Sequence, residues 1–214
     1  ANLDLVLDCA MQAKMRNGGE ACIAANRFIV HEAVAEEFTE RLTEKMAAIQ
    51  AGHGLEEGTT LGPLISAKQR DSVAKLVERA LEQGATATTG GERPDGAGFF
   101  YPATVLANVP DDAEILRQEI FGPVATVTTF STLEEGVAKA NDTEFGLAAY
   151  AFTENFHTAE YLAHALEAGM VGINRSAISD AAAPFGGIKE SGFGREGGAE
   201  GIEEYISVRY IAKP

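Results

Sequence analysis

The sequence predicts an α/β fold, in which a mainly parallel sheet carries helices on both of its faces. Short, apolar, β-branched segments alternate along the chain with longer segments whose apolar residues recur at helical spacing. This alternation is typical of sheets whose parallel strands are connected by helices. The chain has 214 residues, of which 45% are hydrophobic, and this is enough for one sizeable core.

Three helices and one strand are expected in the first 84 residues. The first helix contains Cys9, which is expected to be part of the core, and its stripe consists of Leu3, Leu7, Ala10, Met11 and Lys14. A β-prone strand covers residues 27–30. The helix that follows ends by Gly52, and its stripe consists of Val34, Phe38, Leu42, Met46 and Ile49. Residues 66–69 match a capping box and begin a third helix, which ends at Gly84.

Five strands and two helices are expected in the next 90 residues. The strands cover residues 85–89, 103–106, 124–130, 148–152 and 170–174. Residues 131–135 cap and begin one helix, and the other helix covers 156–167. A loop rich in glycine, serine and alanine follows over 175–198. Residues 204–211 alternate between apolar and polar and predict a strand beyond the domain proper, which needs an edge to pair with.

Charge and composition exclude several classes of function. The net charge of −15 argues against a nucleic-acid partner and against an anionic membrane surface. No apolar run approaches the roughly 18 residues of a membrane-spanning helix. Two cysteines make no disulfide framework, and the four histidines show no metal-ligand spacing. We therefore expect a cytoplasmic protein without a metal site. Because the chain lacks an initiator methionine and begins within a predicted helix, we also expect it to be a fragment.

Cys22 is the main candidate for a catalytic group. It follows Gly18 and Gly19, and the cations Lys14 and Arg16 precede it in an otherwise acidic chain. Nearby positive charge lowers the pKa of a thiol, and the ionised thiol is a nucleophile. The glycines would let the backbone approach a small substrate and present N–H groups to an oxyanion. The alternative is that Cys22 is a small buried hydrophobe, the commoner role of a free cysteine.

Four segments of the chain resemble, in the right order, sequence motifs of the aldehyde dehydrogenase superfamily. They are residues 17–28, Gln118–Pro123, Asn141–Leu147 and Pro184–Gly192. One such match would be weak, but four in order over nearly the whole chain are strong. The resemblance implies the thiol-bearing catalytic domain of that superfamily over residues 1–198. It also implies a C-terminal arm over residues 199–214 that joins an oligomerisation sheet, so that the protein is a homo-oligomer.

The resemblance further implies an oxidation of an aldehyde to a carboxylic acid with NAD or NADP as cofactor. The thiolate of Cys22 would add to the aldehyde carbon, hydride would pass to the nicotinamide, and water would hydrolyse the thioester. The backbone N–H of Cys22 would form part of the oxyanion hole. Glu119 matches the glutamate that accepts hydrogen bonds from the ribose hydroxyls, and Phe121 would pack near the nicotinamide. Without the motif, Glu119 would be a solvated acid and Phe121 a core residue.

Two residues resemble those that hold the distal carboxylate of the substrate in succinate-semialdehyde dehydrogenases. They are Arg16 and Ser179, since a guanidinium binds a carboxylate bidentately and a hydroxyl donates to it. Phe185 would form a wall of the same pocket. The alternatives are a surface ion pair for Arg16 and a loop hydroxyl for Ser179. Another ω-carboxy aldehyde, such as glutarate semialdehyde, is the alternative substrate.

The sequence departs from the superfamily pattern in three ways. Glu20 replaces a glutamine and places a negative charge near the thiol, which opposes thiolate formation unless the carboxylate points away. Ala24 stands where some relatives have a second cysteine, so a disulfide between close neighbours is excluded. The nucleotide-binding domain, the general-base glutamate and the oxyanion-hole asparagine all precede the segment that matches Ala1. We therefore expect no turnover by the isolated chain, and a folding and oligomerisation module without catalysis is the alternative from another class.

Overall fold

The computed structural model describes residues 1–214 and contains five α-helices and eight β-strands. The helices are α1 (Leu3–Met15), α2 (Glu32–Ala47), α3 (Ala67–Glu82), α4 (Leu133–Asn141) and α5 (Phe156–Ala165). The strands are β1 (Arg27–His31), β2 (Thr86–Thr89), β3 (Thr104–Ala107), β4 (Val124–Phe130), β5 (Phe145–Gly146), β6 (Ala148–Ala151), β7 (Met170–Ile173) and β8 (Ile188–Lys189). Three short 3-10 helices are η1 (Arg16–Gly19), η2 (Glu114–Arg117) and η3 (Glu200–Tyr205). None of the helices has both the length and the apolar character needed to cross a lipid bilayer.

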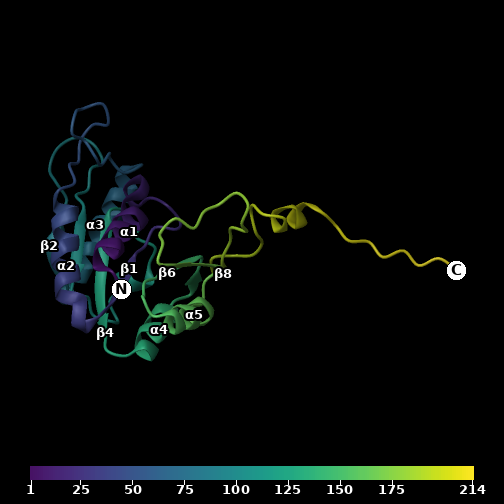
Figure 1. Ribbon diagram of the computed structural model, residues 1–214. Coiled ribbons are helices and arrows are strands. Elements are labelled where there is room, and N and C mark those ends of the chain that lie inside the picture. Colours follow the sequence, from purple (N-terminus) through teal and green to yellow (C-terminus); the bar gives the residue numbers. More distant parts are fainter.

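A four-stranded sheet forms the centre of the larger part of the molecule (Figure 1). Its strand order is β1-β4-β3-β2, in which β1 and β3 run parallel to β4 and the edge strand β2 runs antiparallel to β3. Two smaller sheets consist of the parallel pair β6 and β7 and the antiparallel pair β5 and β8. The predicted, mainly parallel arrangement is confirmed, although the strands are divided among three sheets.

Helices cover both faces of the four-stranded sheet, as predicted. Successive side chains of a strand point to opposite faces. In β3, Val105 belongs to the core cluster that contains Phe38 of α2, whereas Leu106 belongs to the cluster that contains Val73 of α3. The stripe predicted for α2 is wrong at one position, because Val34 is 43% exposed.

The capping of α3 differs from the prediction in a way that affects the site. Ser66 Oγ accepts a hydrogen bond from the N–H of Gln69 at 3.2 Å and caps the helix. The reciprocal half of the capping box is not formed, because Gln69 Nε2 donates instead to the carbonyl oxygens of Ile120 at 3.1 Å and Phe121 at 2.9 Å. The expectation of a full capping box was therefore wrong, and Gln69 connects α3 to the segment that carries Glu119.

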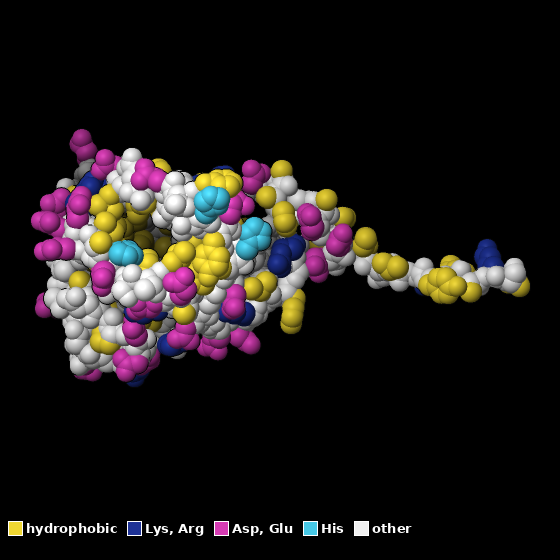
Figure 2. Space-filling model, turned by 60° about the horizontal axis from the view of Figure 1, so that its bottom comes forward, with side chains coloured by type: hydrophobic (Ala, Val, Ile, Leu, Met, Phe, Trp, Pro, Cys, Tyr) yellow, Lys and Arg dark blue, Asp and Glu magenta, His cyan; other side chains and the backbone are white.

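The C-terminal segment also differs from the prediction. The sequence predicts a strand over 204–211, but Tyr205 still belongs to η3, and the chain beyond it extends away from the body without a strand partner (Figure 1). Hydrophobic side chains lie along this extension (Figure 2), and Val208 is 97% exposed. A strand forms only where a partner satisfies its backbone groups, and this chain supplies none.

Candidate active site

The loop that carries Cys22 begins with a sharp turn after α1. Asn17, Gly18 and Gly19 have φ values of 52°, 63° and 81°, in the left-handed region that glycine adopts without strain. A Cβ atom on Gly19 would lie 2.2 Å from the carbonyl oxygen of Gly122. Glycine at position 19 therefore permits a close approach between two parts of the chain, the Cys22 loop and the segment 119–122.

The two cysteines lie in different environments. Cys22 is exposed, and Cys9 is buried within α1. A hydrogen bond from the N–H of Ala25 to the carbonyl oxygen of Ala13, at 3.2 Å, ties the end of the Cys22 loop back to α1. The alternative that Cys22 is a buried hydrophobe was wrong, and the expectation that Cys9 is part of the interior is confirmed.

The residues predicted to bind the cofactor lie on the segment next to this loop. Glu119 is exposed, and Phe121 is half-buried with a φ of 51°. The two hydrogen bonds from Gln69 fix the backbone on either side of Phe121. Because Gly122 packs directly on Gly19, the fold brings together two motifs that are far apart in the sequence.

Lys14 is a buried cation at the junction of these two segments. Its side chain has no exposed surface, and Nζ donates a hydrogen bond to Oδ1 of Asn26 at 3.2 Å. Burial lowers the pKa of Lys14 to about 7, and the negative charge of Glu119 acts in the opposite direction. One feature of the sequence indicates this burial: Lys14 stands on the apolar stripe of the first helix.

Tyr150 of β6 is a site residue that sequence reasoning missed. Its hydroxyl donates a hydrogen bond to the carbonyl oxygen of Ile23, directly after Cys22, at 2.9 Å. Burial and, to a smaller extent, Cys22 raise the pKa of Tyr150 to about 12, and Arg16 acts in the opposite direction. The fold therefore gathers Cys22, Arg16 and Tyr150, although nothing in the sequence of β6 distinguishes Tyr150 from an ordinary strand residue.

Arg16 has no hydrogen-bonding or ion-pair partner in the protein. Every other arginine up to residue 200 forms at least one hydrogen bond or ion pair; these are Arg27, Arg41, Arg70, Arg79, Arg93, Arg117, Arg175 and Arg195. The guanidinium of Arg16 is exposed. The alternative of an ordinary surface ion pair was therefore wrong for Arg16, and its five donors are free for a ligand.

Ser179 and Phe185 lie on the long loop between β7 and β8. Ser179 is exposed and makes no hydrogen bond, but its neighbour Ile178 packs at Gly172 beside the ring of Tyr150. Phe185 is half-buried, and its backbone exchanges two hydrogen bonds with Glu196, at 2.6 and 2.8 Å. The structure thus brings the residue next to Ser179 to the cluster around Cys22, whereas no hydrogen bond connects Ser179 or Phe185 to Arg16.

Glu20 directs its carboxylate toward another segment of the chain. Oε1 accepts a hydrogen bond from the N–H of Ile65 at 3.2 Å, in the loop that leads to α3. A glutamate at this position opposes thiolate formation unless its carboxylate points away from the thiol. The hydrogen bond with Ile65 directs the carboxylate of Glu20 toward another segment, so this condition is met.

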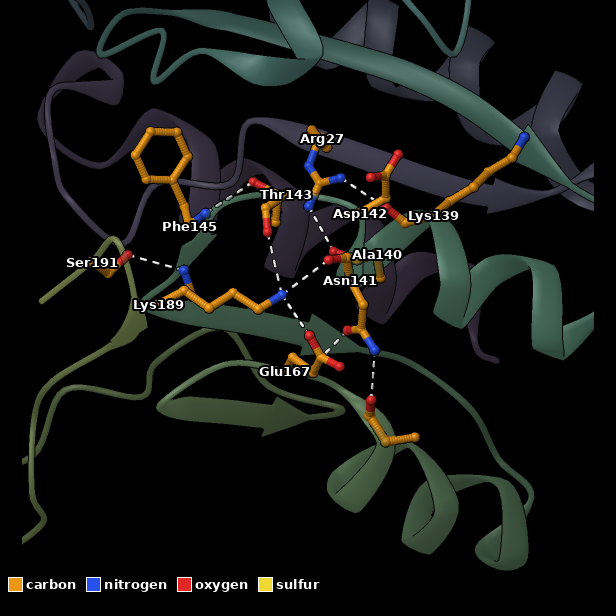
Figure 3. Close-up of polar contacts among 12 residues, drawn as sticks. Arg27, Lys139, Ala140, Asn141, Asp142, Thr143, Phe145, Glu167, Lys189 and Ser191 are labelled. Atoms are coloured by element: carbon orange, nitrogen blue, oxygen red, sulfur yellow. Dashed lines mark hydrogen bonds and ion pairs between the residues drawn. The ribbon is translucent and has the colours of Figure 1, made fainter.

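A polar network connects the third and fourth motif segments (Figure 3). Lys189 Nζ donates to the carbonyl oxygens of Asn141 at 3.0 Å and Thr143 at 3.3 Å, and it forms an ion pair with Glu167 at 2.5 Å. The pairing of β5 with β8 adds backbone hydrogen bonds at the same place. These motif residues therefore hold the loop between β7 and β8 to the rest of the fold.

Arg27 connects the Cys22 segment to the same region. Its guanidinium donates to the carbonyl oxygens of Lys139 and Ala140, both at 2.8 Å, at the C-terminal end of α4 (Figure 3). A cation at this end of a helix satisfies free carbonyl groups and interacts favourably with the helix dipole.

No group of three or more histidine, cysteine, aspartate or glutamate side chains is arranged to hold a metal ion.

The chain resembles a known protein family and its members over nearly its whole length. The model of the aldehyde dehydrogenase family matches residues 1–211. A succinate-semialdehyde dehydrogenase of Paenarthrobacter nicotinovorans is 53% identical over 211 residues, which are 99% of this chain and 47% of the relative. A glutarate-semialdehyde dehydrogenase of Pseudomonas putida is 44% identical over 99% of this chain and 44% of its own length.

A solved structure gives the same result for the fold. The crystal structure of succinate-semialdehyde dehydrogenase from Burkholderia pseudomallei superposes with a TM-score of 0.95 at 43% identity, over 99% of this chain and 44% of that one. The chain spans less than half the length of these relatives. From the family match over nearly its full length, we conclude that this chain belongs to the aldehyde dehydrogenase family.

Proposed function

We propose that this chain is the thiol-bearing part of an enzyme that oxidises succinate semialdehyde to succinate. The observation that carries the proposal is the guanidinium of Arg16, which is exposed, has no partner in the protein and lies with Tyr150 and Cys22. A free guanidinium near a nucleophilic thiol fits an aldehyde whose far end is a carboxylate. The succinate-semialdehyde dehydrogenases among the relatives support the same substrate.

In this mechanism, the thiolate of Cys22 adds to the aldehyde carbon and forms a thiohemiacetal. The backbone N–H of Cys22 donates to the oxyanion that develops on the former carbonyl oxygen. Arg16 binds the distal carboxylate, Ser179 donates a hydrogen bond to it, and Phe185 forms a wall of the pocket. Fixing both ends of a short substrate holds its reacting carbon at the thiol. Loss of hydride from this carbon, to an acceptor that a bound nicotinamide would supply, would leave a thioester on Cys22, and water would hydrolyse it to release the acid and the free thiol.

Glu119 and Phe121 would hold the nicotinamide end of NAD or NADP. The exposed carboxylate of Glu119 can accept hydrogen bonds from two ribose hydroxyls, and the half-buried ring of Phe121 offers an apolar face for a planar group. These residues therefore fit the cofactor. When bound, the nicotinamide supplies the acceptor for the hydride. Among the relatives, one from Escherichia coli is an NADP(+) enzyme and a Bacillus cereus structure is a complex with NAD+.

Two other functions are supported by particular observations. The glutarate-semialdehyde dehydrogenase relative favours a substrate with one more methylene group. The exposed hydrophobic side chains of the C-terminal segment favour a homo-oligomer. If the isolated chain does not turn over an aldehyde, the same side chains favour a non-catalytic folding and oligomerisation module. In either case the proposed setting is the cytoplasm, with a small carboxylated aldehyde as the ligand.

The substitution Arg16→Ala tests the substrate in a holoenzyme that contains this chain. Loss of a charge-assisted, bidentate contact is expected to cost about 2–3 kcal/mol, so KM for succinate semialdehyde should rise roughly 30- to 150-fold. Butanal, which has the same chain length and no carboxylate, should be nearly unaffected. Formation of NADH or NADPH measures both reactions.

Three comparisons separate the candidate functions in the same assay. Arg16→Lys retains the charge without the fork and should lose less than Arg16→Ala. Equal losses on both aldehydes would make Arg16 a structural residue and contradict the proposal. Faster turnover of glutarate semialdehyde than of succinate semialdehyde by the unmodified enzyme would make glutarate semialdehyde the substrate and contradict the proposed one.

A further inference from the structure

Lys14 is the one charged side chain among the buried residues of this chain. Its ammonium group makes a single hydrogen bond, to Asn26 Oδ1, and forms no ion pair. Burying a cation with so few partners costs free energy, whereas a methionine of similar shape would fill the same space at lower cost. A buried lysine that lowers stability is a candidate for a functional role.

The position of Lys14 indicates what that role is. Its side chain touches the Cys22 loop at both ends, because a Cβ on Gly19 would lie 3.1 Å from Lys14 Cε, and Asn26 accepts the hydrogen bond from Nζ. Cys22 lies between these two contacts in the chain. The lysine itself is fixed on α1, and a helix is a more rigid support than a loop.

We propose that Lys14 is a positioning residue for Cys22: it holds Gly19 and Asn26 and thereby fixes the loop between them. The inference rests on the proposed role of Cys22 as the nucleophile. The charged and titratable groups near the two residues include Glu119 on the facing segment, Arg16 beside the thiol and the hydroxyl of Tyr150 on β6.

The pKa of Lys14, which burial lowers to about 7, agrees with this enclosed position between the two ends of the loop.

Alkylation of Cys22 by iodoacetamide tests the proposal on the 214-residue chain. The rate at Cys22 is measured by peptide mapping between about pH 6 and 9, together with thermal unfolding. We expect Lys14→Met to react about threefold more slowly over this pH range, because its loop is no longer held, and yet to be more stable than the unmodified chain. A merely structural residue would not combine higher stability with lower reactivity. Lys14→Arg keeps a donor for Asn26 Oδ1 and should react faster than Lys14→Met.

Each remaining outcome supports or overturns the proposal. Equal rates for Lys14→Met and the unmodified chain over the whole pH range would overturn it, as would a Lys14→Arg variant as slow as Lys14→Met. If Lys14→Met does not fold, Asn26→Leu removes the acceptor and leaves the lysine; slower alkylation supports the proposal, and an unchanged rate overturns it. Cys22 of the unmodified chain reacting no faster than free glutathione would instead contradict the proposed nucleophile.

Discussion

The Cys22 loop and the C-terminal segment are both exposed, but only the loop is held by the rest of the fold. Contacts reach the loop from α1 through Ala13, from the segment before α3 through Ile65, from Gly122, and from β6 through Tyr150. The last hydrogen bond of the C-terminal segment joins the N–H of Ile206 to the carbonyl oxygen of Glu203, at 3.4 Å. Residues 207–214 make none.

This difference shows whether the contacts that fix each segment come from the chain itself or from a partner. A thiol that must meet a substrate in one geometry needs a backbone held from several sides, and the chain supplies those contacts itself. A segment with exposed side chains such as Tyr205, Val208 and Tyr210 has no such support within the chain. Its conformation must therefore be set by a partner or remain extended.

The largest effect is expected from breaking the contact between the Cys22 loop and Gly122. Gly19→Ala places a methyl group against the Gly122 carbonyl and forces a left-handed φ on a residue with a side chain, so we expect a loss of about 3–5 kcal/mol in unfolding free energy. Denaturant unfolding measures it. Gly54→Ala is the matched control, because no atom lies within 4 Å of its new Cβ. Equal stability of the two variants would contradict the packing described for Gly19.

The next effect is the difference in reactivity between the two thiols. Cys22 is exposed on the held loop, whereas Cys9 reacts only when α1 opens. Iodoacetamide should therefore label Cys22 roughly a hundredfold faster than Cys9 in the folded chain. Peptide mapping after brief labelling measures the ratio, and full labelling of both in denaturant is the control. Preferential modification of Cys9 would contradict the assignment of Cys22.

The parts of the fold that follow from local pattern were predictable from the sequence. The helical stripes, the Ser66 cap and the alternation of elements depend on residues a few positions apart. Apart from the short strand β5, the strands and α-helices up to residue 174 lie close to where they are expected. The C-terminal strand followed the same kind of pattern and did not form, because alternation specifies a face and not a partner.

The site was predictable only in part, because its contacts connect distant positions. The hydrogen bond between Tyr150 and Ile23 joins residues 127 positions apart, and that between Gln69 and Phe121 joins residues 52 apart. No local periodicity carries such a pairing. The resemblance to the family identified Cys22 as the candidate nucleophile, and the structure shows that this residue is exposed. The resemblance gave no indication of the role of Tyr150, or of the single hydrogen bond that Lys14 makes.

A smaller effect is expected from the charge buried beneath the held loop. The pKa of Lys14 is about 7 in the folded chain and has its ordinary value of 10.5 in the unfolded one. Between these values the unfolded chain binds the proton and the folded chain does not, so this lysine makes stability rise with pH; below about pH 7 its full cost is present. Lys14→Met should therefore gain stability at pH 7 and below, by at most the roughly 5 kcal/mol that the difference between the two pKa values sets, and the gain should fade toward pH 10.

Thermal or denaturant unfolding of both proteins over this pH range measures the difference. Lys75→Met serves as the control, because Lys75 lies exposed on α3 and its replacement should leave the pH dependence unchanged. A gain for Lys14→Met that did not vary with pH would show that packing, and not the buried charge, limits stability at this position.

The smallest effect on folding, and the one that separates the two regions most clearly, is expected from removing residues 207–214. Because these residues make no hydrogen bond to the rest of the chain, their deletion should change the unfolding free energy of the monomer by less than about 0.5 kcal/mol, within the range of surface changes. Self-association should respond instead, since exposed hydrophobic side chains and unpaired backbone groups are what a second copy can cover. Sedimentation velocity over a range of concentrations measures the shift toward monomer. Val208→Asp in the 214-residue chain is the matched variant: it keeps the backbone, disrupts an apolar contact and should weaken association in the same direction. A deletion that unfolded the monomer would show that the segment belongs to the same cooperative unit as the Cys22 loop, and unchanged association in both variants would remove it from the oligomer interface.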